Sequence, residues 1–239
     1  MSSVIDFHTH ILPNIDDGSA TVQQSIQMLQ AEKAQGIERV ILTPHFYADH
    51  DSPDLFLNKR ARAAQELKDA LEGRDDLPDI AIGTEVRFFE GISDCEFLWD
   101  MAIADTRCIL VEMPMTHWSD RMLDEVVGIR HKQGLIPVIA HLDRYISLFR
   151  THGLPQKLEK LPVLVQANAE FFIRRTMRPM ALRMLAADRI HLLGSDCHNL
   201  KGRAPNLGEA VKFIRKRLGE DSLERIVAHQ KYATALPSR

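Results

Sequence analysis

The sequence has few cysteines, no long apolar run and no excess of positive charge. Its 239 residues include only Cys95, Cys108 and Cys197, which are too few and too scattered for a disulfide framework and are typical of a reducing compartment. No stretch approaches the roughly 20 apolar residues of a membrane-spanning helix, and the start, MSSVIDFHTHILP, lacks the basic segment of a signal peptide. We therefore predict a cytoplasmic protein that does not insert into a membrane.

The charge balance disfavours nucleic acid as a partner. Lysine and arginine number 30 against 33 aspartate and glutamate, a net charge of -3, so the chain has no general attraction for a polyanion. The 45% hydrophobic residues are enough for a folded core. Because no linker rich in proline, glycine or serine interrupts the chain, we expect one domain over residues 1–239.

Strand-like and helix-like segments alternate along the chain. Seven short apolar runs rich in β-branched residues are predicted to be buried parallel strands, at residues 4–5, 40–42, 80–82, 109–111, 137–140, 163–165 and 190–193. Segments with helical periodicity lie between them: one begins after an N-cap at Ser19 and ends at Gly36, and the others cover about residues 54–72, 120–133, 170–187, 205–218 and 221–229. Each unit takes roughly 30–35 residues, as βαβ units require. This α/β pattern favours a (β/α)7 barrel over an open doubly wound sheet.

Potential metal ligands follow the predicted strands at their carboxyl ends. They are His8, His10, Asp17, His45, Glu85, Glu112, His141, Asp196 and His198. In a parallel barrel these ends meet at one face, where active sites are built. A catalytic zinc site uses about three protein ligands, so nine nitrogen and oxygen donors predict two or three divalent ions, with manganese, iron or zinc suited to them.

Residues near the predicted ligands indicate which substrate binds and which carboxylates orient the ligands. Arg144 and Arg203 have guanidinium groups that can grip phosphate oxygens in pairs, so a phosphate ester is the expected substrate. A single histidine or glutamate after a strand is usually a capping or solvated residue, and only the joint pattern makes a centre convincing. Asp6 and Asp16 are interpreted as carboxylates that orient imidazoles or bond to the backbone, without binding an ion.

A second phosphatase pattern overlaps this set. Cys197 to Arg203 is formally C-x5-R, the signature of tyrosine phosphatases with a cysteine thiolate nucleophile. We disfavour that interpretation because Cys197 alternates with Asp196 and His198 in an extended segment and so points away from them. The bulky Leu200 and Lys201 would also crowd a phosphate-binding loop.

The motifs together resemble a known superfamily. D-F-H-T-H with D-D-G, then T-P-H, G-T-E, V-E, A-H-L-D-R and S-D-C-H-N-L-K-G-R-A-P are similar to those of the PHP (polymerase and histidinol phosphatase) superfamily, over residues 5 to about 208. Within it, the chain resembles the metal-dependent protein-tyrosine phosphatases of bacterial capsule and exopolysaccharide operons. The resemblance implies a distorted (β/α)7 TIM-like barrel with two or three ions, commonly manganese, with iron, zinc or magnesium as alternatives. It also implies hydrolysis of phosphotyrosine on the tail of an operon-encoded bacterial tyrosine kinase.

The resemblance also implies roles for individual residues. It assigns His8, His10, Glu85 and Asp196 to one ion, Glu85, Glu112 and His141 to a second, and Asp17, His45 and His198 to a third. It makes Arg144 and Arg203 the phosphate clamp. The chain departs from the family at Leu142-Asp143 and over the segment from Phe46 to Asp54. The sequence leaves the role of this segment open. The departure therefore leaves the substrate preference open, but not the chemistry.

Three other functions compete with this interpretation. The first is another PHP phosphoesterase, acting on histidinol phosphate or a small sugar or nucleotide phosphate. The second is a regulator that binds metal and docks on a kinase without turnover, which the complete ligand set disfavours. The third is a polymerase appendage, which we disfavour because the sequence ends at Arg239 with no polymerase attached. The sequence is compatible with an oligomer.

Overall fold

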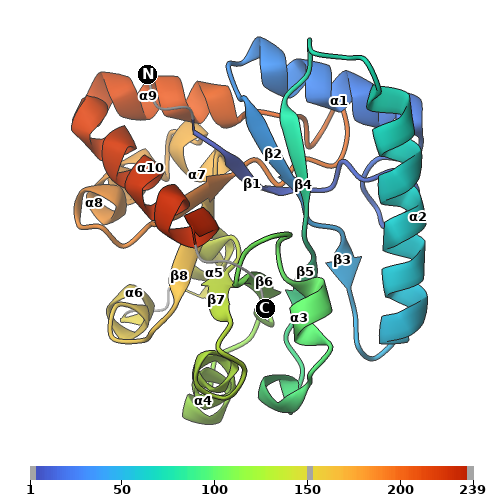
Figure 1. Cartoon of the computed structure of the whole chain (residues 1–239). Coiled ribbons are helices and arrows are strands. Elements are labelled where there is room, and N and C mark those ends of the chain that lie inside the picture. The colour runs from blue at the N-terminus through green and yellow to red at the C-terminus, as the bar shows by residue number, and fades with distance from the viewer. Residues whose placement is uncertain (1–3, 150–152, 236–239) are drawn as a thin grey trace.

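The computed structural model describes residues 4–149 and 153–235, which form a curled parallel sheet with helices outside it (Figure 1). The strands are β1 (Asp6–Thr9), β2 (Arg39–Leu42), β3 (His45–Phe46), β4 (Asp79–Ile82), β5 (Glu85–Arg87), β6 (Cys108–Glu112), β7 (Ile136–Ile139), β8 (Leu164–Asn168) and β9 (Leu192–Gly194). They pair in the orders β1-β2-β4 and β3-β5-β6-β7-β8-β9, and all the pairings are parallel. A parallel bridge between Thr9 and Cys197 joins the β1 end to the segment after β9.

Six of the seven predicted runs overlap observed strands, β1 begins directly after the predicted run 4–5, and β3 and β5 lie outside the predicted runs. Only Thr43 and Pro44 separate β2 from β3, and only Gly83 and Thr84 separate β4 from β5. Two of the barrel strands are therefore broken in the middle, and their second halves belong to the larger sheet. The predicted (β/α)7 fold is confirmed, while β3 and β5 are too short to be visible as apolar runs.

The helices follow the strands and cover the outside of the sheet. Their bounds are α1 (Val22–Ala34), α2 (Pro53–Leu71), α3 (Leu98–Met101), α4 (Asp120–Gly128), α5 (Leu142–Phe149), α6 (Leu154–Leu158), α7 (Glu170–Ile173), α8 (Arg178–Ala186), α9 (Leu207–Leu218) and α10 (Glu220–Ala235). A 3-10 turn over Ile92–Asp94 precedes α3, and a π turn over Ile129–Gln133 continues α4. Figure 1 shows α1 and α2 beside β2 and β4, and α8, α9 and α10 on the opposite side. None of the helices within the described ranges is long and apolar enough to span a membrane.

Two helix predictions were wrong in detail. The N-cap of α1 is Thr21, whose hydroxyl accepts from the amide of Gln24, whereas the Ser19 hydroxyl donates to the Thr21 carbonyl. The segment predicted as one helix over 170–187 is divided into α7 and α8. Pro179 lies in the first turn of α8, where its missing N–H costs nothing, whereas in the middle of a longer helix it would break a hydrogen bond.

The apolar residues form two layers that leave room for a polar site at one end of the barrel. The larger cluster lies between strands and helices and includes Leu42, Val111 and Ile139. The smaller cluster fills the barrel interior, and its strand members include Phe7, Ile41, Ala81, Leu110, Val138, Leu164 and Leu192. The barrel is therefore closed by packed side chains below the carboxyl ends of the strands, and ligands reach the site only from those ends.

Candidate metal centre

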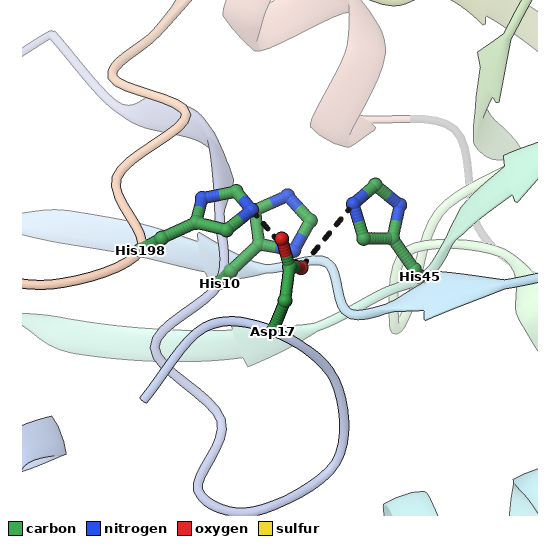
Figure 2. Close-up of side chains that lie close together, drawn as sticks. All are labelled: His10, Asp17, His45 and His198. Carbon is green, nitrogen blue, oxygen red and sulfur yellow. Dashed lines mark ion pairs between the residues drawn. The ribbon is translucent and has the colours of Figure 1, made fainter. Parts of the chain in front are cut away.

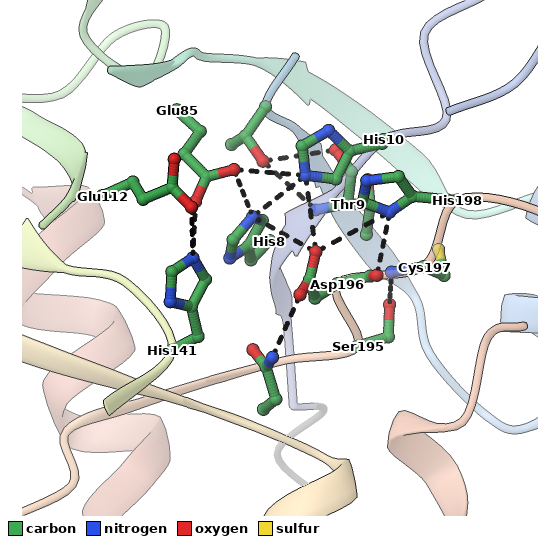
Figure 3. Close-up of polar contacts among 12 residues, drawn as sticks. His8, Thr9, His10, Glu85, Glu112, His141, Ser195, Asp196, Cys197 and His198 are labelled. Carbon is green, nitrogen blue, oxygen red and sulfur yellow. Dashed lines mark hydrogen bonds and ion pairs between the residues drawn. The ribbon is translucent and has the colours of Figure 1, made fainter. Parts of the chain in front are cut away.

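Eight of the nine predicted ligands come from the carboxyl ends of strands, and Asp17 comes from the loop after β1. His8, His45, Glu85 and Glu112 lie within strands, while the others follow β1, β7 and β9. Figures 2 and 3 show the side chains directed toward one another from these separate elements. The barrel thus brings together residues that are far apart in the sequence. For example, the amide of Ser195 donates a hydrogen bond to Asp6, 189 positions away.

A β-bulge in β1 aims His8 at the centre. Asp6 pairs with Val40 and Thr9 with Leu42, so two residues of β1, Phe7 and His8, lie opposite one residue of β2. The extra residue lets Phe7 pack into the apolar interior while His8 still points to the same side as His10. Simple alternation along an extended strand predicts the pairing of His8 with His10 but not this irregularity.

The first group of donors surrounds one point. The Nε2 atoms of His8 and His10 are 3.1 Å apart, and Glu85 Oε2 lies 3.0 Å and 3.3 Å from them. Asp196 Oδ1 lies 3.7 Å from His8 Nε2 and 3.5 Å from His10 Nε2 (Figure 3). Donors bound at about 2.0–2.2 Å from one ion are separated from each other by about 3.0–3.6 Å, so His8, His10 and Glu85 have the spacing of a single coordination shell. Asp196 Oδ1 lies slightly farther out and is not in the group whose donor atoms are all within 4.8 Å of one another.

Glu85 joins this group to a second one. Its Oε1 lies 2.9 Å from His141 Nε2, which is also 3.5 Å from Glu112 Oε1. The two oxygens of one buried carboxylate therefore face different sets of donors, as in a bridging ligand. His45 Nδ1 is 3.1 Å from Glu85 Oε2, and His45 forms a further close group with Glu85 and Glu112.

The third group lies on the more open side of the site. Asp17 Oδ1 is 3.3 Å from His198 Nε2 and 3.7 Å from His45 Nε2, and its side chain is 67% exposed (Figure 2). His10 belongs to this group as well, because donor atoms of all four residues lie within 4.8 Å of one another. The prediction placed Asp17, His45 and His198 here without His10, and the geometry puts His10 between the first and third groups.

Three imidazoles are held in the tautomer that a metal ligand requires. The Nδ1 atom of His10 is 2.7 Å from Asp16 Oδ2, and that of His198 is 3.0 Å from the Asp196 carbonyl. The Nδ1 atom of His8 is 3.3 Å from Gln166 Oε1. A proton on each Nδ1 donates to these acceptors and leaves the Nε2 lone pair directed at the centre. The buried Nε2 of His198 has no hydrogen-bond partner, so the donor set fits divalent ions.

Burial and mutual charge shift the pKa values in the direction that a cation site needs. Burial would raise the pKa of Glu85, but the imidazoles of His8, His10 and His141 outweigh it and hold the pKa well below its usual range. Burial would lower the pKa of His141, but hydrogen bonds to Glu112 and Glu85 raise it to about 9. The site therefore attracts positive charge strongly, and protons compete with metal ions for its imidazoles.

Asp16 and Asp6 have the supporting roles that the sequence predicts. Asp16 accepts from His10 and from the amides of His45 and Gly18, and these bonds overcome burial and lower its pKa to about 2. Asp6 accepts from the amides of His8 and Ser195. Each carboxylate therefore ties one metal-binding segment to its neighbour.

Sequence reasoning missed two polar residues at the end of β8. Gln166 Oε1 accepts from the His141 amide at 2.6 Å, and Asn168 Nδ2 donates to Asp196 Oδ2 at 3.0 Å. They alternate with Ala167 directly after the predicted strand 163–165, which is the same spacing that identifies His8 and His10. That signal was available in the sequence.

The backbone is strained at two of the predicted ligands. His141 has φ of 30° and Asp196 has φ of 55°, both in the left-handed region that favours glycine. Such conformations cost about 1–3 kcal/mol and persist where the surroundings fix them. Each residue lies two positions after a barrel strand, β7 or β9, so the strain falls on residues whose backbone sets the direction of a predicted ligand.

The predicted phosphate clamp lies on one side of the donor groups. Arg144 and Arg203 donate to the two different oxygens of Asp196, Arg203 at 2.6 Å. Both arginines line a cavity of about 310 Å³. They are thus positioned beside Asp196 at the edge of the centre, where they can reach a bound anion.

The segment from Phe46 to Asp54 borders the opposite side. Phe46 is fully buried, so it cannot contact a substrate, whereas Tyr47 is half-buried and stacks on His45 with ring centroids 5.2 Å apart. Tyr47 and the exposed Leu55 line a second cavity, of about 570 Å³, together with Asp17 and His45. This cavity opens directly onto the third group of donors.

The structure disfavours a thiolate nucleophile at Cys197. The side chain is fully buried, and its thiol points to Glu32 Oε1 at 3.9 Å, on the side of α1. Burial and the nearby carboxylates of Glu32 and Asp6 raise its pKa well above the ordinary value. A neutral, enclosed thiol is a poor nucleophile, which agrees with the prediction that Cys197 packs behind the strand end.

Several known proteins are similar to this chain in sequence and in fold. Tyrosine-protein phosphatase YwqE from Bacillus subtilis is 30% identical over 226 residues, covering 91% of this chain and 86% of the relative. Tyrosine-protein phosphatase CpsB from Streptococcus pneumoniae is 28% identical, covering 90% and 91%. A crystal structure from work on YwqE and CpsB, described as unique metal-dependent tyrosine phosphatases, matches with a TM-score of 0.84 at 25% identity and covers 99% of this chain and 100% of that one.

More distant structures share the fold alone. A phosphotriesterase homology protein from Escherichia coli matches with a TM-score of 0.52 at 12% identity, covering 96% of this chain and 98% of that one. The sequence also matches the family of capsular polysaccharide synthesis proteins CpsB/CapC over residues 4–234. Since that match spans nearly the whole chain, the protein belongs to the CpsB/CapC family.

Proposed function

We propose that this protein is a metal-dependent protein-tyrosine phosphatase, a phosphoric monoester hydrolase. The observation that carries the proposal is the convergence of imidazole Nε2 atoms and carboxylate oxygens on shared points, with two arginines beside them. The relatives named tyrosine-protein phosphatases supply the substrate class. Residues 1–239 act as a single phosphoesterase domain in this proposal.

The nine predicted ligands would hold two or three divalent ions, with manganese as the proposed metal. His8, His10, Glu85 and Asp196 form one set, Glu85, Glu112 and His141 a second, and Asp17, His45 and His198, with His10 nearby, a third. Bound divalent ions polarise a phosphoryl group and lower the pKa of a coordinated water toward neutrality. Asp16 and Gln166 keep His10 and His8 in the orientation that leaves Nε2 available.

Arg144 and Arg203 would bind the phosphate oxygens that face away from the ligand groups. In this structure both guanidinium groups donate to Asp196, so they are already held at the edge of the site. Charge on the phosphoryl oxygens changes as the ester bond breaks, and fixed guanidinium donors stabilise that change without reorganising. Phosphate binding and rate acceleration therefore depend on the same two residues.

The tyrosyl ring of the substrate would lie in the 570 Å³ cavity against Tyr47. The cavity begins at Asp17 and His45 and contains the exposed apolar side chain of Leu55, so it suits an aromatic group attached to a phosphate at the centre. Phenolate is a fair leaving group, with a conjugate acid of pKa about 10. The reaction consequently does not require a strong general acid, which His45 and His198 cannot supply while they bind metal.

The biological substrate we propose is a phosphotyrosine on a bacterial tyrosine kinase of capsule or exopolysaccharide synthesis, in the cytoplasm. Membership of the CpsB/CapC family supports the pathway, and the net charge of -3 gives no reason to expect a nucleic acid. The tail of an operon-encoded kinase is proposed because the sequence motifs resemble those of phosphatases that act on such tails.

A substrate panel tests this function. With Mn²⁺ bound, kcat/KM should be at least about tenfold higher for a phosphotyrosyl peptide than for histidinol phosphate, because the cavity beside Tyr47 favours an aryl ester. A preference for histidinol phosphate would identify a small-molecule phosphoesterase. Stoichiometric metal with no turnover of either compound would favour a regulator that only binds a kinase.

A further inference from the structure

The cavity on the arginine side extends beyond the phosphate clamp. Its volume is about 310 Å³, and it runs from Asp196, Arg144 and Arg203 to Arg174, the C-cap of α7, and Met177, the N-cap of α8. Cavities that bind small groups start at about 300 Å³, so this one has room for a single side chain of a bound peptide. The proposed phosphate position therefore continues into an unassigned compartment.

Arg174 is a positively charged residue of this compartment whose side chain is mostly exposed and only loosely paired. Its side chain is 64% exposed, and its Nε is 3.6 Å from Glu170 Oε1, an exposed pair one helical turn away. Such exposed pairs contribute about 0–1 kcal/mol and exchange readily. Its neighbour Arg178, by contrast, donates to the Phe172 carbonyl and covers the ring of Phe213, so it is committed to packing.

Two of the three carboxylates that line the compartment are engaged elsewhere, and the third, Glu170, is loosely paired with Arg174 itself. Asp143 is buried and accepts from the Asn168 amide at 2.9 Å. Asp196 is bound by both clamp arginines and is a proposed metal ligand. Glu170 is half-exposed and offers only the loose pair with Arg174. A ligand entering past the clamp therefore meets Arg174 as an available positive charge.

We propose that Arg174 and this cavity form a specificity subsite for an acidic side chain within three residues of the phosphotyrosine of the substrate, on the stretch of peptide that crosses the site from the Tyr47 cavity to the clamp. The proposal rests on the proposed function, because the phosphate must be anchored by Arg144 and Arg203 for the neighbouring residue to reach the subsite. The guanidinium group of Arg174 binds the carboxylate of that residue and exchanges its exposed pair with Glu170 for it. Arg174 selects among phosphopeptides and has no contact with the reacting atoms.

Pairs of phosphopeptides that differ in one residue test the subsite. Each pair carries glutamate or the isosteric glutamine at one position within three residues of the phosphotyrosine, on either side. For at least one position the Mn²⁺-loaded wild-type protein should show a kcat/KM about 2–5 times higher with glutamate, since an exposed ion pair contributes an effect of about that size. The ratio should fall toward one at high salt.

Matched variants assign the preference to Arg174. Arg174→Ala should bring the Glu/Gln ratio to about one, Arg174→Lys should keep part of it, and Arg174→Glu should invert it. Arg175→Ala is the control, because Arg175 is equally exposed and adjacent but does not line the cavity, and it should keep the wild-type ratio. Because the readout is a ratio within one protein, partial loss of folded enzyme does not affect it.

The outcomes separate this proposal from the proposed function. If the wild-type protein hydrolyses both members of every pair equally, or if Arg174→Ala keeps the preference, the subsite is wrong while the phosphatase stands. If the metal-loaded protein hydrolyses no phosphotyrosyl peptide at all, the proposed function fails and the subsite fails with it.

Discussion

Histidines and carboxylates gather at both ends of this barrel, but in two different ways. At the carboxyl ends of the strands, the Nε2 atoms of His8 and His10 face each other at 3.1 Å. At the opposite end, His191 Nδ1 accepts from the Val165 amide at 2.9 Å, and His229 Nε2 bonds Asp188 at 2.9 Å. The second cluster has satisfied its hydrogen bonds locally, while the first directs lone pairs at a shared point. The number of histidines is therefore less informative than where their nitrogen atoms are directed.

The pKa values of His141 in the first cluster and His191 in the second shift in opposite directions, whereas burial lowers the pKa values of His45 and His198 in the first cluster as it does that of His191. Carboxylates around His141 overcome burial and raise its pKa to about 9. Burial, with the positive charge of His229 as a second cause, lowers the pKa of His191 to about 4. The two close carboxylates therefore decide the direction of the shift at His141, and burial decides it at His191. Substitutions at each end should reveal this contrast.

The largest effect should follow from removing a shared ligand. Asp196→Ala should lower kcat with a phosphotyrosyl peptide by more than about 100-fold and reduce the metal content, because losing a ligand exceeds the 10–100-fold cost of losing a ligand's partner. Elemental analysis and steady-state kinetics measure both quantities. Asp188→Ala at the other end is the control and should keep the metal and the turnover. Near-normal activity and metal content in Asp196→Ala would show that the centre is misplaced.

The next effect separates the metal site from a thiolate site. Arg203→Ala should cost about 3 kcal/mol of transition-state stabilisation, with kcat reduced as well as KM raised, since the guanidinium group meets charge that develops on phosphate. Cys197→Ser should keep most of the turnover because Cys197 packs against Glu32 away from the ligands. An inactive Cys197→Ser protein with intact fold and metal content would make Cys197 the nucleophile.

A smaller loss of metal affinity or activity should follow from changing Asp16, which holds the ring of His10 in place. Asp16→Asn keeps the size of the side chain but weakens the acceptor of the His10 Nδ1 proton. We expect metal affinity or activity to fall by about 10–100-fold. Titration of the stripped protein with Mn²⁺ measures this. If Asp16→Asn binds Mn²⁺ as tightly as the wild type, Asp16 does not control the tautomer of His10.

Much of this contrast was predictable from the sequence, and the exceptions have physical causes. Apolar runs located the barrel strands because buried parallel strands are hydrophobic on both faces. They failed for β3 and β5, where His45 and Glu85 themselves occupy the short strands. The bulge that directs His8 depends on pairing with β2, which no local pattern specifies. Gln166 and Asn168 were missed, although their alternation after a strand was visible.

The same limits apply to the roles of the side chains. His229 has the same local chemistry as a ligand, and only its tertiary contact with Asp188 shows that it is satisfied. The sequence predicted the nine candidate ligands by their position after strands, and the structure gathers them at one face (Figures 2 and 3). His10 lies between two donor groups, which could not be predicted because it depends on distances between three separate loops.

The smallest effect concerns the histidine end and its response to pH. The unfolded chain protonates His191 near pH 6.5, but the folded protein does so only near pH 4. Folding stability should therefore fall as the pH drops from about 6.5 to 4, by about 1–2 kcal/mol from this residue after allowing for its partial exposure. His191→Asn keeps an acceptor for the Val165 amide and removes the titration, so its stability should decline less. Denaturant unfolding at several pH values, under identical metal conditions, measures the difference, and parallel curves for the two proteins would contradict the assignment.

The most direct test of the central claim is metal removal and return. The protein is stripped with a chelator, and phosphate release from a phosphotyrosyl peptide is measured together with metal content before stripping, after stripping and after adding Mn²⁺. The ligand geometry predicts two or three ions per chain, loss of nearly all turnover on stripping, and recovery in proportion to the Mn²⁺ bound. Full turnover in a protein shown to contain no metal would contradict the account.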